Sequence, residues 1–242
     1  MIARLLLVLA PLLIACSKPQ LSSEKNGANE VVFVLHGFGD NKAGIWPLAS
    51  RLEDAGFTVY RIGYTSIGRT PEEIQRDVYE QIQAKLKTES RTVHFVGHSF
   101  GGLLIRSFLS NHSVRTLGRV VLIGTPNKGT ALVDMYHDSW WMKILGKTAM
   151  SLGTDSASLP NSLSDPYYPV GVIAGLSDGL FATHILSDPN DNVVPVESAS
   201  LDGMADMIVI RSSHAMLRFD REVSDQTITF LRSGSFARIT DP

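Results

Sequence analysis

The sequence has little of what several common classes of protein require. It contains one cysteine, Cys16, in 242 residues, so it can form neither an intrachain disulfide nor a cysteine-based metal site. Its 22 basic and 24 acidic side chains give a net charge of −2, with no basic cluster that would bind nucleic acid. Its longest apolar run, residues 5–15, is too short to span a bilayer comfortably. Stability therefore has to come from an ordinary hydrophobic core, for which the chain is long enough.

The N-terminal segment predicts export. A positively charged start and a short apolar run are typical of a signal peptide, here residues 1–15. Residues 13–16 read L-I-A-C and resemble the lipobox of bacterial lipoproteins, whose cysteine is lipidated and becomes the new N-terminus. We predict that Cys16 carries the lipid and that residues 16–29 form a flexible tether. The alternative is a secretory signal with an incidental cysteine. An Asp after the cysteine would resemble an inner-membrane retention signal, so in a Gram-negative host Ser17 favours the outer membrane, on its periplasmic or surface side.

Residues 30–242 have the pattern of one α/β domain. Short apolar runs alternate with longer amphipathic segments, which predicts a mostly parallel sheet of about six strands with helices on both faces. The predicted strands are residues 31–35, 57–64, 92–96, 119–123, 170–174 and 207–210. A capping box at Thr70 predicts a helix to about Leu86, and further helices are predicted at 46–52 and 223–231.

Ser99 is the candidate nucleophile. Residues 97–102 read G-H-S-F-G-G and lie between a predicted strand and an apolar helical run, residues 103–109. In a sharp strand-to-helix turn the serine is strained, and the residues two before and two after it must be small, as Gly97 and Gly101 are. The alternative is a glycine-rich turn without catalysis, but the context favours a nucleophile elbow.

A serine hydroxyl needs a base, and His214 is the candidate. A nucleophile elbow goes with the chain order serine, acid, histidine, and His214 alone among the seven histidines follows the last predicted strand. The alternatives are that His214 is an ordinary loop histidine, or that His184 is the base, which would reverse the order. His98, next to the nucleophile, is expected to pack beside the elbow.

The acid that orients the base is expected in residues 188–195, D-P-N-D-N-V-V-P. Asp191 is preferred, because D-x-V-V-P at 191–195 resembles the acid loop of many α/β-hydrolases. Asp188 remains the alternative acid, and for either residue the structural alternative is a helix or turn cap.

These motifs together resemble bacterial lipases and related esterases of the α/β-hydrolase superfamily. The resemblance runs from about residue 30 to the end and includes H-G-F at 36–38, the elbow at 97–102, G-T-P-N-K-G-T at 124–130, Asp191 and His214. It implies carboxylic ester hydrolysis through an acyl-enzyme, without a cofactor. The sequence itself shows no convincing metal site, and it lacks the extra antiparallel strands and paired cysteines of larger lipases.

The resemblance also implies an oxyanion hole made by the backbone N–H groups of Phe38 and Phe100. In α/β-hydrolases one donor leaves the end of the first strand, here at residues 36–39, and the other follows the nucleophile. His36 is then expected to orient the loop. The alternative for this segment is an ordinary glycine turn.

Residues 130–168 are the one segment long enough to form a small cap over the nucleophile. Trp140 and Trp141 lie in it. The favoured interpretation is a helix that packs these aromatic side chains against the sheet. The alternative is an exposed apolar cap suited to an acyl chain or a membrane interface.

The sequence thus predicts a lipid-anchored serine hydrolase that acts on small-molecule or lipid esters. Thioesterases and acyltransferases use the same residues, so both remain alternatives. A hypothesis of another class is a surface-anchored binding lipoprotein that keeps the fold without turnover.

Overall fold

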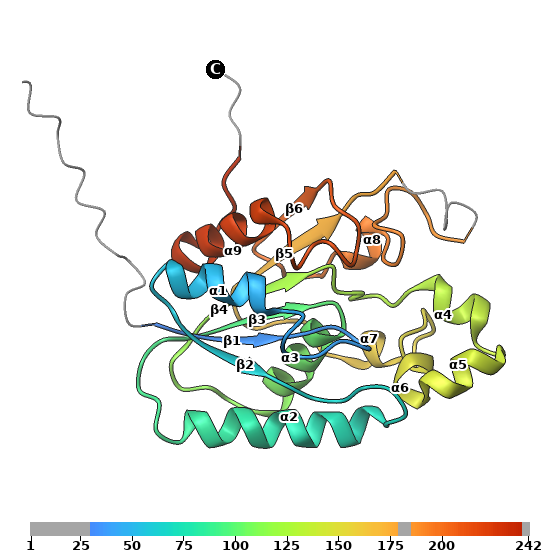
Figure 1. Ribbon diagram of the computed structural model, residues 1–242, viewed down its shortest axis with the longest axis horizontal. Helices are drawn as coiled ribbons and strands as arrows, with labels where there is room; N and C mark the ends of the chain where they lie inside the picture. The colour runs from blue at the N-terminus through green and yellow to red at the C-terminus, as the bar shows by residue number, and fades with distance from the viewer. Residues whose placement is uncertain (1–29, 179–184, 239–242) are drawn as a thin grey trace, which may run out of the picture.

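The computed structural model describes residues 30–178 and 185–238. The predicted signal peptide, Cys16, the predicted tether and His184 lie outside these ranges. The described elements, shown in Figure 1, are β1 (Val31–Leu35), α1 (Trp46–Asp54), β2 (Thr58–Ile62), α2 (Pro71–Leu86), β3 (Val93–His98), α3 (Phe100–Asn111), β4 (Leu117–Ile123), α4 (Ala131–Tyr136), α5 (Trp140–Leu145), α6 (Lys147–Met150), α7 (Leu159–Ser162), β5 (Val170–Gly175), α8 (Val196–Ala199), β6 (Asp206–Ile210) and α9 (Arg221–Ser233).

Six strands form one sheet in the order β2-β1-β3-β4-β5-β6, and every neighbouring pair is parallel. The predicted α/β architecture is confirmed, and the predicted strands differ from the observed ones only at their ends. The expected near-continuous apolar strand is clearest in β1, which is buried along its whole length. All strands point the same way, so their carboxyl ends meet at one edge of the sheet.

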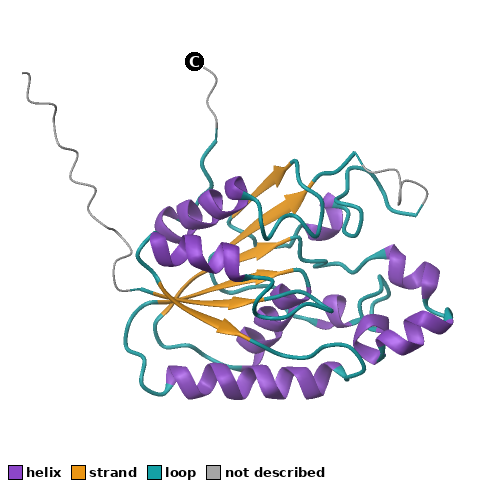
Figure 2. Cartoon of the chain, in the orientation of Figure 1, coloured by secondary structure: helices purple, strands orange, loops and turns teal. Residues whose placement is uncertain are grey.

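Helices cover both faces of the sheet (Figure 2). Alternate residues of β1 enter different layers, because successive side chains of a strand point to opposite faces. Phe33 packs with side chains of α2 and α3, whereas Val34 packs with side chains of α1 and α9. The sheet and both covering layers lie between residues 31 and 236. Residues 30–242 therefore contain a complete core and are expected to fold by themselves.

The predicted capping box starts α2. The Thr70 hydroxyl accepts a hydrogen bond from the Glu73 amide, and the Glu73 carboxylate accepts one from the Thr70 amide. Such a cap contributes about 1 kcal/mol to stability. The buried side chains Ile74, Val78 and Ile82 recur every four residues and face the sheet, as their spacing predicts.

Four short helices, α4 to α7, occupy residues 131–162 beyond the carboxyl ends of the strands (Figure 1). The expectation that both tryptophans pack against the sheet is wrong, because Trp140 and Trp141 are exposed and Met142 is the buried residue of α5. The helix is only six residues long, so one side chain can face inward while its neighbours face out. Among the described residues, no helix is long and apolar enough to cross a membrane.

Candidate active site

Ser99 lies at the turn between β3 and α3, with φ 54° and ψ −125°. Such a backbone conformation is rare for a residue with a side chain and indicates local strain. The two glycines allow the turn. A Cβ at Gly97 would lie 2.5 Å from the Gly102 nitrogen, and one at Gly101 would lie 2.5 Å from the His36 oxygen. Small residues at both positions are therefore sterically necessary, as the sequence pattern around Ser99 predicts.

The structure brings Ser99, His214 and Asp191 together. His214 Nε2 is 2.9 Å from Ser99 Oγ, and His214 Nδ1 is 2.8 Å from Asp191 Oδ2. The main-chain carbonyl oxygen of Asp191 also accepts a hydrogen bond from the His214 N–H, at 3.0 Å, so main chain and side chain hold the two loops together. Asp188 is exposed and binds the Asn190 side chain instead. This geometry is that of a nucleophile, a base and an orienting acid.

Asp191 is completely buried, and both of its carboxylate oxygens are used. While Oδ2 faces His214, Oδ1 accepts hydrogen bonds from the amides of Val193 and Val194, at 2.9 and 2.7 Å. These amide donors compensate the carboxylate for the water it has lost. They also fix the rotation of the carboxylate, so Oδ2 can only point at the imidazole.

Gly124, the first residue of the G-T-P segment, covers the His214–Asp191 pair. A Cβ there would lie 3.3 Å from His214 Nδ1 and 3.4 Å from Asp191 Oδ2, and its φ of 54° also favours glycine. The main chain therefore packs directly on this hydrogen bond and keeps water away from it. The resemblance to lipases includes this segment, but no local sequence pattern predicts this contact.

The residues predicted to form the oxyanion hole lie on both sides of Ser99. Phe100 is the first residue of α3, so its N–H has no acceptor within the helix. Gly37 packs against the serine, since a Cβ there would lie 3.2 Å from Ser99 Cβ. Across residues 30–178 and 185–238, the amides of Phe38 and Phe100 donate to no turn, loop or side-chain acceptor. Both donors are thus available next to the nucleophile.

His36 orients the loop that carries Phe38. Its ring stacks on Tyr64 with 4.0 Å between centroids, and its Nε2 accepts a hydrogen bond from the Tyr64 amide. The Tyr64 hydroxyl in turn donates to the His36 carbonyl oxygen. Burial lowers the pKa of His36, which favours the neutral ring that this packing requires.

His98 packs beside the elbow as predicted, and it has a contact that the sequence does not reveal. Its Nε2 is 3.0 Å from the carbonyl oxygen of His214, so this nitrogen carries the proton and donates. Burial, followed by the nearby His214, lowers the pKa of His98 to about 3. The neutral His98 side chain therefore connects the loop of His214 to β3, the strand that precedes Ser99.

An ion pair links the loop that carries His214 to the loop that carries Phe38. Arg218 Nε lies 3.5 Å from Asp40 Oδ2, and both side chains are largely buried. Asp40 follows Phe38 by two residues and Arg218 follows His214 by four. Neither residue has a sequence signal that would distinguish it from an ordinary surface charge.

Arg106 is the buried charge of α3 and was also missed. Its guanidinium donates to the carbonyl oxygen and the side-chain oxygen of Asn127, both at 3.2 Å, and to carbonyl oxygens of residues 160–164. It thereby connects the nucleophile helix to the G-T-P segment and to α7. A single arginine within an otherwise apolar helical run was the available signal.

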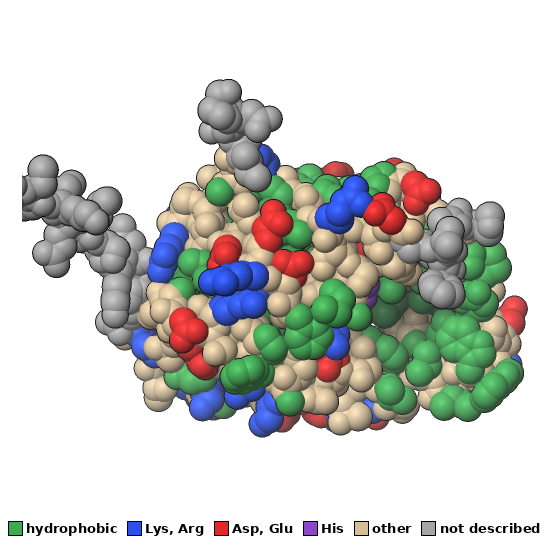
Figure 3. Space-filling model, turned by 45° about the horizontal axis from the view of Figure 1, so that its top comes forward, with side chains coloured by type: hydrophobic (Ala, Val, Ile, Leu, Met, Phe, Trp, Pro, Cys, Tyr) green, Lys and Arg blue, Asp and Glu red, His purple; other side chains and the backbone are tan. Residues whose placement is uncertain are grey.

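A mostly apolar cavity of about 440 Å³ opens from the nucleophile toward the short helices. Ser99 and His214 line it, together with apolar side chains such as Met142, Leu145 and Leu152. The space-filling view shows a hollow with histidine inside it and hydrophobic side chains around it (Figure 3). The cavity is large enough for an apolar chain attached to an atom that reacts with Ser99.

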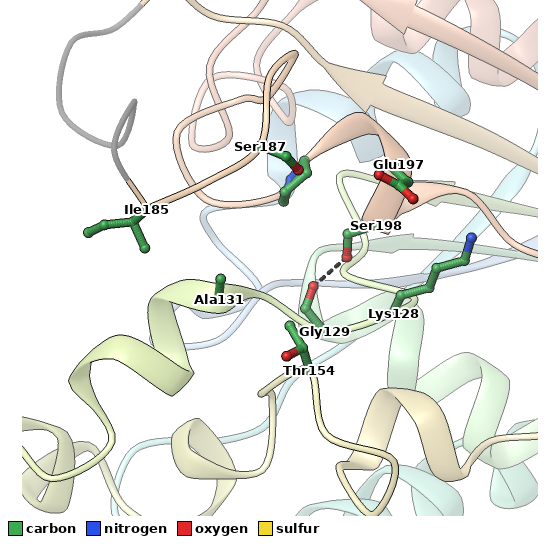
Figure 4. Close-up of a pocket in the computed structure, with 9 residues that line it drawn as sticks. Lys128, Gly129, Ala131, Thr154, Ile185, Ser187, Glu197 and Ser198 are labelled. Carbon is green, nitrogen blue, oxygen red and sulfur yellow. Dashed lines mark hydrogen bonds between the residues drawn. The ribbon is translucent and has the colours of Figure 1, made fainter.

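A second cavity of about 320 Å³ lies beyond the start of α4 (Figure 4). Gly129 and Ala131 line it, whereas Thr130 and Leu132 line the larger cavity. Thr130 is extended, so alternate residues of this segment face different cavities. The Thr130 hydroxyl donates to the Val193 carbonyl oxygen at 2.6 Å, which joins two residues that line the larger cavity.

Within the described residues, no group of three or more His, Cys, Asp or Glu side chains is arranged to hold a metal ion. The groups around Ser99 are instead those of nucleophilic catalysis by side chains.

The chain belongs to the alpha/beta hydrolase family, whose family model matches residues 31–204. No curated protein matches it significantly in sequence.

Solved structures show the same fold at low sequence identity. The lipase BlEst2 of Bacillus licheniformis in its mature form is 18% identical, with a TM-score of 0.65 over 85% of this chain and 91% of that one. The phospholipase PlaB of Legionella pneumophila, in complex with thio-NAD, is 16% identical, with a TM-score of 0.65 over 85% and 59%. A metagenomic carboxyl esterase is 12% identical, with a TM-score of 0.56 over 79% and 66%.

Proposed function

We propose that this protein is a serine hydrolase that cleaves carboxylic esters, including lipid esters, through an acyl-enzyme on Ser99. The observation that carries the proposal is the hydrogen-bonded series from Ser99 to His214 to Asp191, whose first two members line an apolar cavity. Fold alone would not support an activity, but this arrangement supplies each group that acyl transfer requires.

In the proposed reaction, Ser99 Oγ attacks the ester carbonyl carbon while His214 Nε2 takes the hydroxyl proton. Asp191 holds the proton of Nδ1 and stabilises the imidazolium. The N–H groups of Phe38 and Phe100 bind the oxyanion. The C–O bond then breaks, and the leaving alcohol takes the proton from His214. Water, deprotonated by the same imidazole, attacks the acyl-enzyme and releases the acid and Ser99.

The test is hydrolysis of p-nitrophenyl esters from acetate to palmitate by residues 30–242, with Ser99→Ala as control. We expect turnover by the wild type and background rates for the variant, with the chain-length optimum separating an esterase from a lipase. If the wild type turns over thioesters or transfers acyl groups to alcohols but leaves oxygen esters intact, the thioesterase or acyltransferase alternative replaces the proposal.

A fluorophosphonate probe separates catalysis from the binding lipoprotein hypothesis. Labelling of Ser99 that is lost in His214→Ala would support an activated nucleophile. A folded protein without labelling and without turnover would favour a scaffold that only binds.

We further propose that the protein is exported and anchored to the outer membrane through lipidated Cys16. The support is the L-I-A-C sequence at 13–16 and the following Ser17. Expression of the full chain and of Cys16→Ser in a Gram-negative host, followed by membrane fractionation and mass measurement, tests this. An unmodified mass for the wild-type cysteine would refute lipidation.

A further inference from the structure

Helices α4 and α5 expose an unusual concentration of apolar side chains. Trp140 is 74% exposed, Ile144 63% and Met135 59%, and Tyr136 and Trp141 are also exposed. Single exposed apolar residues are ordinary, but five within ten residues form a patch that requires an explanation. Figure 3 shows hydrophobic side chains covering this end of the molecule, beside the hollow. We call these five residues the α4–α5 face.

The α4–α5 face is continuous with the cavity that contains Ser99. Tyr136 and Trp141 belong to both, and their rings lie 5.2 Å apart, which joins the two helices. On α5, Trp141 and Leu145 line the cavity, whereas Trp140 and Ile144, also four residues apart, point away from it. An occupant of this face therefore lies directly at the entrance through which an apolar chain would reach the nucleophile.

Exposed aromatic side chains with lysines beside them favour a lipid surface as the occupant of this face. Lys143 and Lys147 are exposed beside it, and in the described part of the chain neither forms an ion pair. Three acidic side chains lie nearby. Asp134 is bound to the amide and hydroxyl of Thr154, Glu72 has its pKa lowered by hydrogen bonds at the start of α2 and in part by Lys147, and Asp138, between α4 and α5, is fully exposed. Tryptophan and tyrosine rings next to apolar and lysine side chains are the combination that partitions into the headgroup region of a bilayer. The lysines would contact anionic headgroups.

We propose that the α4–α5 face binds the surface of a phospholipid bilayer that carries anionic headgroups. The role of this binding rests on the proposed ester hydrolysis, because it places the cavity entrance against the layer that holds the substrate. The binding itself needs no catalysis, so the two proposals can fail separately.

The test is sedimentation of residues 30–242 with sucrose-loaded vesicles of phosphatidylcholine, with and without phosphatidylglycerol, at low salt. Ser99→Ala is present in every chain, so that no lipid is hydrolysed. Trp140→Ala with Ile144→Ala removes two side chains outside the cavity and should lower the partition coefficient about tenfold or more. Lys143→Gln with Lys147→Gln should lower it about tenfold, only for the anionic vesicles.

Tyr167→Ala is the matched control. Tyr167 is an aromatic residue that is 68% exposed, and it precedes β5, at the opposite edge of the sheet from Ser99. This variant should bind vesicles as the parent does. In chains with Ser99 intact, the Trp140/Ile144 variant should hydrolyse p-nitrophenyl acetate at the wild-type rate and unfold at the wild-type temperature.

Three results would overturn the proposal. The first is absence of binding to either vesicle by the parent chain. The second is equal loss of binding in the Tyr167 and Trp140/Ile144 variants. The third is a dimer in solution that the Trp140/Ile144 variant converts to monomer, because a second copy would then cover the face. Failure of ester hydrolysis with vesicle binding intact would refute the proposed function and leave the docking surface standing.

Discussion

Replacing Asp191 with Asn tests the proposed role of the acid without removing a side chain. Asn has nearly the same shape, and one end of its amide is an acceptor while the other is a donor. Oδ1 of Asp191 accepts two amide hydrogen bonds at 2.9 and 2.7 Å. The amide oxygen of Asn should occupy that position, since the reverse orientation would place an NH₂ group against two N–H donors. The NH₂ group then faces His214.

That orientation reverses the tautomer of the base. In the wild type, Nδ1 donates to Asp191 and Nε2 accepts the Ser99 proton across 2.9 Å. An NH₂ group at 2.8 Å from Nδ1 makes this nitrogen the acceptor, so the proton moves to Nε2, which can no longer deprotonate Ser99. The loss of kcat should be on the order of 10⁴-fold, the size that the same change has in another serine hydrolase.

The assay is stopped-flow or extended-time hydrolysis of a soluble p-nitrophenyl ester, with thermal unfolding measured in parallel. Asp188→Asn is the control, since Asp188 is exposed and bonded elsewhere, and it should retain wild-type kcat. An Asp191→Asn variant that folds normally and keeps more than a tenth of the wild-type kcat would refute the assignment of Asp191.

Three further outcomes are expected. His98 is neutral in the folded protein, with a pKa of about 3 against about 6.5 when unfolded, so the unfolded state binds the extra proton between these values. The contribution of neutral His98 to stability is complete above pH 6.5 and falls as the pH approaches 3. Between pH 7 and 4.5 the melting temperature of His98→Asn should therefore fall less steeply than that of the wild type. Arg106→Met leaves several buried carbonyl oxygens without a donor and should lower the free energy of unfolding by about 3 kcal/mol in urea titrations; an unchanged midpoint would contradict this. Gly101→Ala places a Cβ 2.5 Å from the His36 oxygen and should abolish fluorophosphonate labelling, whereas full labelling would show that the elbow tolerates the methyl group.

The sequence predicted the elements with strong periodic or turn signals. The buried strand at 31–35, the helix that starts at Thr70 and the position of Ser99 between β3 and α3 all follow from local patterns. The preference for Asp191 over Asp188 and the choice of His214 agree with the contacts that the structure shows. Their catalytic roles stay predictions until activity is measured.

The long-range contacts could not be predicted in the same way. The contact between His98 and the His214 carbonyl joins residues 116 positions apart, and no local pattern specifies it. The ion pair between Asp40 and Arg218 has the same character. The orientation of the tryptophans was predicted wrongly because a six-residue helix has too few turns for its pattern to show which face is buried.

Because all strands run in the same direction, the start of the domain and the site around Ser99 lie at opposite ends of the sheet. The chain enters the domain at Glu30, at the amino edge of the sheet, whereas Ser99 and the α4–α5 face lie at the carboxyl edge (Figure 1). The tether predicted from the composition of residues 16–29 would cover roughly 20 Å as a random coil, whereas a domain of this length has a diameter of roughly 45 Å. A protein held through Cys16 would thus present its active site outward, away from the bilayer that anchors it. It would be built to reach a facing membrane, or lipid arriving from elsewhere, more readily than the leaflet beneath it.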